Sequence, residues 1–441
     1  MIVPPELSWT HLLPTGLSYA PSERVGPLAE ALQALGGDRR RRILVMANAR
    51  HGAFPSLDAF HGLAALNCTG VKTEALRASG FDYVRRFAML PRADRLRWLI
   101  PLDNAAVSAG ALQLYGAVRA TARAKHAVAR SAARARLPIW YRDELLIACR
   151  ETSPLESGLA SVVGDQGVRL AISSGAPGPL ARRKPSVAVV GQNGALLAVA
   201  KLAVSPVSEA MARQESSVLE TLEAKMPSVR APRVMFGGTL NGTYTLVQSA
   251  VHGRAPGTDL TDAHRRFLAT LRLPERRPLP ASDWGRALQR RVTSQRPDDP
   301  VLSHLFAAVQ DALAAEALPA AVVHGDFAPW NLREQDGKLA AYDWENATID
   351  GVAFVDEIHH RLVVGHLMHD WSAERAMRDI EALADSHRGR PEPAVVKAIA
   401  GACVLDFCLR LIEHGHTETD PIMIWYRELA ARLQATIAVP A

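Results

Sequence analysis

The sequence predicts an α/β domain followed by an α+β region in which antiparallel strands come first and helices dominate afterwards. The chain has 441 residues, more than one average domain requires. Ser, Gly and Pro gather at 151–168, as they do in linkers, and strand patterns give way to helical patterns near residue 250. We therefore expect an α/β domain over 1–150, a strand-rich part over 151–250 and a mainly helical part over 251–441.

The composition is that of an ordinary globular protein, with 48% hydrophobic and 22% charged residues. No run of 18 apolar residues occurs, and the first residues lack the basic and apolar regions of a signal peptide, so we expect a cytoplasmic protein. The cysteines are scattered and form no C-x-x-C motif, which argues against a disulfide framework. They are Cys68, Cys149, Cys403 and Cys408.

The first 150 residues contain three strand candidates and one long helix candidate. The strands are "RRILVMANA" (41–49), "RRFAMLP" (85–91) and "RWLIPLD" (97–103), and the Ala-rich helix covers 104–137 and ends at Pro138. No nucleotide fingerprint, nucleophile elbow or metal cluster occurs in this domain. Its role is therefore not predicted, and neither is the oligomeric state of the chain.

Positive charge is concentrated in this first domain, which holds 21 Lys and Arg against 11 Asp and Glu. A basic helix face could contact a membrane surface, an acidic partner or nucleic acid, and a solvated exterior is the favoured interpretation because the opposite face is mostly alanine. Nucleic acid is disfavoured because no zinc-finger spacing or aromatic signature accompanies the charge. The face consists of Arg119, Arg123, His126, Arg130 and Arg134.

Residues 168–250 predict a strand-rich region with one helix. Segments 168–173, 186–190 and 195–204 have the composition of strands, and Asn193-Gly194 is a hairpin signal between the last two. A helix over 208–225 and the strand pair "RVMFGG" and "TYTLVQSA" complete the pattern. Consecutive strands joined by short turns favour antiparallel pairing.

From about residue 257 the sequence is mainly helical, and "VLSHLFAAVQDAL" (301–313) keeps apolar residues at helical spacing. The exception is "AVVHGDFAPWNLREQDGKLAAYDWENATIDG" (321–351), which places two short strands among the helices. Each of these strands is followed by a carboxylate, Asp326 or Asp343.

These carboxylates predict a phosphoryl-transfer site, because that reaction needs a base near the attacking hydroxyl, a metal ion and a cation on the phosphates. Asp326 follows the first strand as a candidate base, and Asn331 lies five residues later. Asp343 follows the second strand, and carboxylate and amide oxygens are ligands that Mg²⁺ prefers.

The phosphate anchor is expected in the strand-rich part. Lys201 lies near the end of a strand, and Glu215 lies in the next helix at a place suited to pairing with it, with Glu220 as the rival. The turn "SSGAPGP" contains Gly175 and Gly178, which could lie over phosphates although they do not form G-x-G-x-x-G.

The motifs "HGDFAPWN" and "YDWE" resemble the H-G-D-x-x-x-x-N and D-W-E signatures of the aminoglycoside phosphotransferase and choline kinase-like family, over about residues 165–441. This resemblance implies a bilobal protein-kinase-like fold, with an antiparallel-sheet N-lobe and a mainly helical C-lobe, and use of ATP and Mg²⁺. It implies that Asp326 is the catalytic base, that Asn331 and Asp343 bind the metal, and that Lys201, oriented by Glu215, touches the α- and β-phosphates.

The same resemblance places the hinge between lobes at "LVQSAVHG", where backbone groups of Gln248, Ser249 and Ala250 would bind adenine. It also makes Asp356 a structural residue. The phosphate loop departs from the family pattern, which leaves the roles of Gly175 and Gly178 open.

Other side chains near these motifs have two interpretations each. His324 is expected to be architectural rather than a proton carrier, and Glu345 contacts either a metal or substrate, or makes a structural hydrogen bond. Three histidines of 356–371 could share a helix face and bind zinc, but a polar helix near the substrate is favoured. They are His359, His366 and His369.

The leading hypothesis is an ATP- and Mg²⁺-dependent kinase that phosphorylates a hydroxyl of a small molecule. The basic segment 273–292 favours a neutral or anionic acceptor, such as a sugar or carbohydrate intermediate, over an aminoglycoside. One alternative is a pseudokinase scaffold that binds nucleotide without catalysis. Another is a bifunctional enzyme whose N-terminal domain has a second activity.

Overall fold

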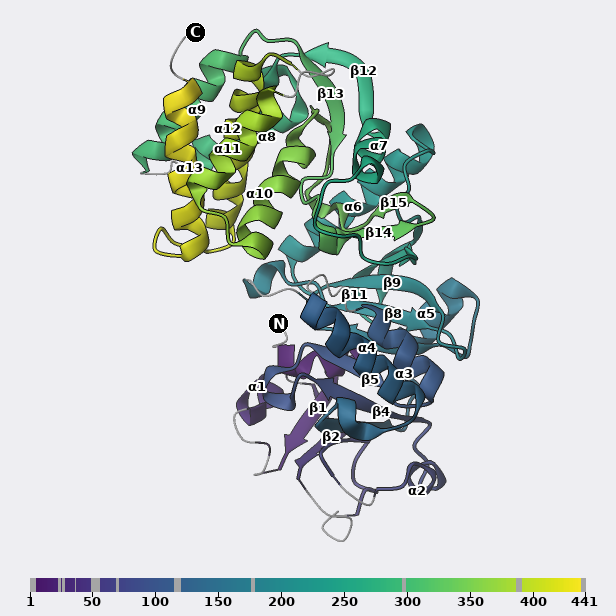
Figure 1. The fold of residues 1–441 in the computed structure, drawn as a ribbon. Coiled ribbons are helices and arrows are strands. Elements are labelled where there is room, and N and C mark those ends of the chain that lie inside the picture. The colour runs from purple at the N-terminus through teal and green to yellow at the C-terminus, as the bar shows by residue number, and fades with distance from the viewer. Residues whose placement is uncertain are drawn as a thin grey trace. The chain divides into compact units, whose positions relative to one another are not determined.

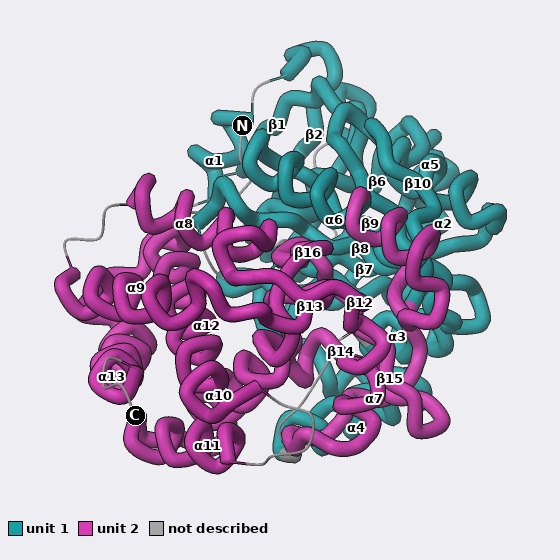
Figure 2. The backbone as a smooth tube through the Cα atoms, turned by 90° about the horizontal axis from the view of Figure 1, so that it is seen from above, with its two compact units in different colours: residues 1–216, 233–250 teal, residues 217–232, 251–441 magenta. Residues whose placement is uncertain are grey.

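The computed structural model forms two compact units. Unit 1 consists of residues 1–216 and 233–250, and unit 2 of residues 217–232 and 251–441 (Figure 2). Helix α6, Pro206–Lys225, contributes to both. The structure describes residues 5–22, 25, 28–35, 37–48, 56–68, 71–114, 120–175, 179–295, 299–385 and 391–437.

Unit 1 is built on one mixed sheet of eleven strands in the order β1-β2-β3-β6-β4-β5-β7-β8-β9-β11-β10 (Figure 1). The pairs β1–β2 and β2–β3 are parallel, and every other neighbouring pair is antiparallel. The strands are β1 Leu17–Pro21, β2 Asp38–Ala47, β3 Gly62–Leu66, β4 Tyr83–Leu90, β5 Trp98–Pro101, β6 Asp143–Cys149, β7 Arg169–Ser173, β8 Ser186–Val190, β9 Leu196–Ala203, β10 Val234–Leu240 and β11 Thr243–Ser249.

Helices cover both faces of this sheet. Helices α3, Ala105–Ala111, and α4, Ala120–Arg134, contribute to the apolar cluster on one face, and α5, Pro154–Val163, contributes to the cluster on the other. Two short helices, α1 Leu28–Ala34 and α2 Thr73–Ala78, complete the unit. Because both faces are covered, strands such as β3 are buried along their whole length.

The prediction of one long helix over 104–137 is wrong. Helix α3 is followed by a 3₁₀ turn at Leu112–Leu114, and α4 begins at Ala120. The two helices pack against each other, and His126 of α4 donates a hydrogen bond to the carbonyl that Leu112 presents at the end of α3. Of the expected basic face, Arg123 and Arg134 are exposed, whereas Arg119 lies outside the described residues.

The segment 151–168, expected to be a linker, instead contains helix α5. Ser153 caps this helix by accepting a hydrogen bond from the Glu156 N–H, and Gly164 ends it in the left-handed conformation with φ +72°. The sheet continues across this segment, since β5 pairs with β7. The division into domains at residue 150 therefore stays a prediction, and the structure groups both sides of it in unit 1.

Unit 2 is mainly helical and contains two small antiparallel sheets. Its three-stranded sheet has the order β12-β13-β16, and its hairpin consists of β14 and β15. The strands are β12 Arg272–Arg277, β13 Leu318–Val323, β14 Leu332–Gln335, β15 Lys338–Ala341 and β16 Thr348–Val352. The helices are α7 Asp262–Thr270, α8 Asp283–Gln295, α9 Pro300–Leu313, α10 Val355–His369, α11 Ala373–Asp385, α12 Pro393–Glu413 and α13 Pro421–Ile437.

The core of unit 2 forms where α9, α12 and α13 pack together. The helix predicted over 301–313 is confirmed as α9, and Asp299 caps it by accepting a hydrogen bond from the Val301 N–H at 2.9 Å. The segment 273–292, expected to be helical, forms β12 before α8 begins. Within the described residues, no helix combines the length and the hydrophobicity needed to cross a membrane.

Candidate active site

The loop after β13 begins with a histidine that holds its shape. The His324 ring is fully buried, and its Nδ1 accepts a hydrogen bond from the Asp326 N–H at 3.3 Å. Its Nε2 donates to the carbonyl of Tyr342 at 3.0 Å, just after β15. Both ring nitrogens are therefore engaged in linking the two short strands, which supports the architectural interpretation of His324.

The next residue, Gly325, adopts a conformation that glycine suits. Its φ is +79°, and an added Cβ would lie 2.4 Å from the carbonyl oxygen of Asn346. Asp356 of α10 accepts hydrogen bonds from the N–H groups of His324 at 2.7 Å and of Gly325 at 3.0 Å. Burial raises the pKa of Asp356. Its two contacts give it the structural role that the sequence resemblance implies.

Asp326 has its carboxylate fixed at both oxygens. His359 of α10 lies 3.2 Å from Oδ1, and the side-chain amide of Asn331 donates to Oδ2 at 2.9 Å. The side chain remains 30% exposed, so a substrate can reach it. Burial would raise the pKa of Asp326, but the hydrogen bond and the electrostatic effect of His359 outweigh burial and lower that pKa. The carboxylate is therefore ionised at neutral pH.

Three oxygen-bearing side chains flank the β14–β15 hairpin: Asn331 precedes it, and Asp343 and Glu345 follow it. The carbonyl of Asn331 accepts a hydrogen bond from the Tyr342 N–H at 3.0 Å, which brings Asn331 beside Asp343. Asp343 has φ +69°, and one of its carboxylate oxygens lies within 4.8 Å of one from Glu345. The amide nitrogen of Asn331 donates to Asp326, so a cation ligand from this side chain would be its amide oxygen. Hard oxygen donors of this kind fit Mg²⁺.

Lys201 and Glu215 form a buried ion pair in unit 1. Lys201 Nζ lies 2.7 Å from one carboxylate oxygen of Glu215 and 2.6 Å from the other. On β9, Ala200 and Leu202 point into the large core, so alternation places Lys201 on the opposite face, towards α6. The predicted pairing of Lys201 with Glu215 is therefore present, and Glu215 rather than its rival Glu220 makes these two contacts.

The predicted adenine-binding segment lies at the end of β11. The Ser249 N–H donates to the carbonyl of Arg233 at 2.9 Å, and the Ala250 N–H donates to Leu197 at 3.4 Å. The buried side-chain nitrogen of Gln248 has no hydrogen-bond partner within the described residues. Adenine recognition by these backbone groups stays a prediction.

The glycine turn between β7 and β8 is described only in part. Gly175 has φ +89°, and an added Cβ would lie 2.9 Å from the carbonyl oxygen of Lys184. Its N–H donates to the Ser173 hydroxyl at 3.4 Å. Gly178 lies outside the described residues. A role for this turn over phosphates stays a prediction.

The zinc alternative gains no support from the described residues, because no group of close metal-ligating side chains there contains His359, His366 or His369. His359 instead contacts Asp326, and the ring of His366 stacks on Trp425 with centroids 4.5 Å apart. Sequence reasoning therefore missed the contact of His359. The available signal was its position three residues after Asp356, on the same face of one helix.

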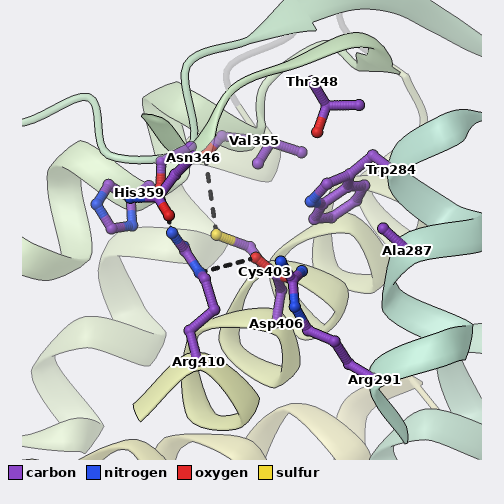
Figure 3. A pocket seen from close by; sticks show the side chains of 11 residues that line it. Trp284, Ala287, Arg291, Asn346, Thr348, Val355, His359, Cys403, Asp406 and Arg410 are labelled. Carbon is purple, nitrogen blue, oxygen red and sulfur yellow. Dashed lines mark hydrogen bonds and ion pairs between the residues drawn. The ribbon is translucent and has the colours of Figure 1, made fainter. Parts of the chain in front are cut away.

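Sequence reasoning also missed a small pocket in unit 2, between α8, α10 and α12 beneath the loop (Figure 3). Arg410 donates to the carbonyl of Gly325 at 2.7 Å and is ion-paired with Asp406, which Arg291 also contacts. No motif marks these residues, because they follow the loop by about 80 positions or precede it. The lining includes Trp284, Arg291, Gly325, His359, Asp406 and Arg410.

Comparison with known proteins assigns this region to a family, since residues 186–397 match the model of the phosphotransferase enzyme family. The matched segment is similar to that family and covers just under half of the chain. The match includes Lys201, Glu215 and the loop at Asp326, and it confirms the expected resemblance and the expectation of a phosphotransferase. The first 150 residues lie outside the match.

Solved structures give distant likenesses. A thermostable mutant of aminoglycoside phosphotransferase APH(4)-Ia is 14% identical with a TM-score of 0.45, over 65% of this chain and 100% of that chain. Macrolide 2'-phosphotransferase MphH from Brachybacterium faecium is 19% identical with a TM-score of 0.36, over 64% and 98%. The curated proteins contain no match to the chain.

Proposed function

We propose that the chain transfers the γ-phosphoryl group of ATP to a hydroxyl of a small molecule. The observation that carries this proposal is the Asp326 carboxylate, partly exposed, with a lowered pKa and with both oxygens held by neighbouring donors. A carboxylate placed in this way orients an acceptor hydroxyl and accepts its proton.

The reaction balances without any further reactant. The acceptor oxygen forms a bond to the γ-phosphorus, and the bond from that phosphorus to the bridging oxygen breaks. ADP leaves with the electron pair of the broken bond, and the hydroxyl proton moves to Asp326. Lys201, held by Glu215, offsets negative charge on the phosphates.

The donor set beside Asp326 fits a magnesium ion. Asn331 and Asp343 would hold it, and Glu345 lies close enough to Asp343 to assist. When bound, Mg²⁺ neutralises charge on the transferring phosphoryl group. In the segment proposed to bind adenine, the buried side-chain nitrogen of Gln248 has no hydrogen-bond partner among the described residues. These residues support the use of ATP and Mg²⁺.

For the acceptor we propose a neutral, hydroxyl-rich molecule such as a sugar or carbohydrate intermediate. The basic segment 273–292 does not offer the surplus of positive charge that its sequence indicates, because three of its arginines are paired with carboxylates. The pairs are Arg277–Asp350, Arg286–Asp283 and Arg291–Asp406. This pairing reduces the surplus of positive charge that favoured an anionic acceptor, and a neutral polyol requires no charged partner.

The test replaces Asp326 with asparagine and measures release of ADP from Mg-ATP, with water as the acceptor and with added sugars. We expect D326N to bind Mg-ATP as the parent does and to turn over about 10² to 10⁴ times more slowly, the usual contribution of a general base. A D326N enzyme with the parent's kcat would refute the role of Asp326. Mass spectrometry of metabolites incubated with the enzyme and labelled ATP would identify the acceptor.

The same measurements distinguish the pseudokinase alternative from an active kinase. A scaffold that only binds nucleotide would give a thermal shift with Mg-ATP but no ADP release, with or without sugars. The bifunctional alternative stays a prediction, because residues 1–150 lie outside the segment that matches the family.

A further inference from the structure

The catalytic loop is held from behind by consecutive turns of helix α10. Asp356, in the first turn, accepts hydrogen bonds from the N–H groups of His324 and Gly325. His359 lies three residues later, so its side chain projects from the same face, and it contacts the carboxylate of Asp326. One helix face therefore contacts three consecutive residues of the loop.

The contact between His359 and Asp326 is buried on one side and open on the other. His359 is 3% exposed, and its ring lies against Phe407 of α12 with centroids 5.4 Å apart. The Asp326 side chain is 30% exposed. Since a carboxylate oxygen accepts more than one hydrogen bond, this contact leaves room for a substrate hydroxyl on the exposed side of Asp326.

A second helix fixes the backbone at the same point. Arg410 of α12 donates to the carbonyl of Gly325, and Figure 3 shows Arg410 and His359 lining the same pocket. Arg410 is itself held by Asp406. With the backbone restrained by Asp356 and Arg410, the remaining freedom of Asp326 is rotation of its side chain, and His359 and Asn331 restrict that rotation from opposite oxygens.

We propose that His359 is a positioning residue of the phosphoryl-transfer site, which holds the Asp326 carboxylate in the orientation that meets the acceptor hydroxyl. This inference rests on the proposed function. Small misplacements of a catalytic group cost about 10²-fold in rate, so the loss of one of the two restraining donors has a measurable effect on turnover.

The test uses four single variants and the hydrolysis of Mg-ATP, followed as ADP release with water as the acceptor. H359L removes the donor and keeps an apolar side chain of similar bulk, whereas H359Q keeps an N–H donor at a similar reach. H359N has the same amide on a shorter side chain that does not reach Asp326. H366L is the control on α10, because His366 stacks on Trp425 and has no contact with the loop among the hydrogen bonds of the described residues.

We expect H359L and H359N to lower kcat by about 10- to 100-fold while KM for ATP stays within about twofold. H359Q recovers most of that loss, and H366L keeps the parent's kcat. A purely structural role would lower the melting temperature of H359L, H359N and H359Q alike, without the recovery by glutamine. If H359L does not fold, the comparison of H359Q with H359N decides the question alone.

Three results would overturn the inference. In one, H359L turns over as fast as the parent while D326N is inactive, so the proposed function stands and His359 has no part in it. In another, H359Q is as slow as H359N, so the donor is not what matters. In the third, the parent neither binds nor hydrolyses Mg-ATP, and the proposed function fails together with the inference.

Discussion

The ion pair between Lys201 and Glu215 gives the sharpest prediction about stability. Glu215 is fully buried and Lys201 is 7% exposed, and both carboxylate oxygens lie within 2.7 Å of the ammonium nitrogen. Replacing Lys201 with methionine leaves the buried carboxylate without its cation. Breaking a buried pair in this way costs about 3–5 kcal/mol, because the remaining charge loses its partner and does not regain water.

A matched control lies on the same helix. Arg213 and Glu209 of α6 also approach to 2.7 Å, but their side chains are 59% and 40% exposed. An exposed pair contributes about 0.2–1 kcal/mol, so R213M should cost far less than K201M although the two contact distances are equal. R213M also removes the contact of Arg213 with the Tyr244 ring at 4.1 Å, so this control overstates the cost of losing the exposed pair and makes the comparison conservative.

The assay is urea unfolding followed by circular dichroism, with the m-value checked for constancy across variants. K201M should lose about 3–5 kcal/mol, and K201M/E215L should recover much of the loss, because apolar replacement of a buried pair is often neutral or stabilising. A K201M variant that loses no more than R213M would show that water reaches the carboxylate and would refute the reasoning.

Two further predictions concern ligand binding and acid. D343A should lose the thermal shift produced by Mg-ATP, whereas the parent at about 100 times Kd gains about 2.7 kcal/mol, and an equal shift in both proteins would contradict the assignment of Asp343. Burial lowers the pKa of His11 and of His360 in the folded protein to about 4, from the ordinary histidine value of 6.5. Below pH 6.5 the unfolded chain therefore binds more protons at these two histidines than the folded protein does. The free energy of unfolding is therefore unaffected by these histidines above about pH 6.5 and falls as pH decreases towards 4, by about 2 kcal/mol for each histidine at pH 5. A melting temperature equal at pH 7.5 and pH 5 would contradict this.

The parts of the site that sequence predicted share a local origin. His324, Gly325 and Asp326 are adjacent, and Asn331 follows within the same loop, so their spacing is set by one short stretch of backbone. Gly325 shows why the spacing is strict, since its positive φ and its closeness to the Asn346 carbonyl leave no room for a side chain. Lys201 and Glu215 were predicted because a strand followed by a helix limits which residues can pair.

The parts that sequence could not predict depend on long-range packing. In unit 1, β3 pairs with β6, whose residues lie about 80 positions later, and no local pattern selects that partner. The division of 104–137 into α3 and α4 similarly depends on the contact of the two helices. The ion pairs of 273–292 were likewise not predictable, because Asp350 and Asp406, which pair with Arg277 and Arg291, are far away in sequence.

The loop motif is predictable from sequence, whereas the residues of α10 and α12 that hold it are not, and this difference has a physical cause. A loop that must present a carboxylate to a substrate cannot bury that carboxylate. The apolar side chain of Phe327, which is buried and stacks on Phe267, anchors the loop but does not orient the carboxylate of Asp326. The orientation of the carboxylate and of the backbone beside it comes from polar contacts with elements that are themselves packed, and here those are α10 and α12. Such supports require only a donor or acceptor at the right point in space, which residues 30 to 85 positions away supply without any fixed spacing to the motif. The chemistry of the site is therefore visible in the sequence, while the residues that hold it in position become visible only in the fold.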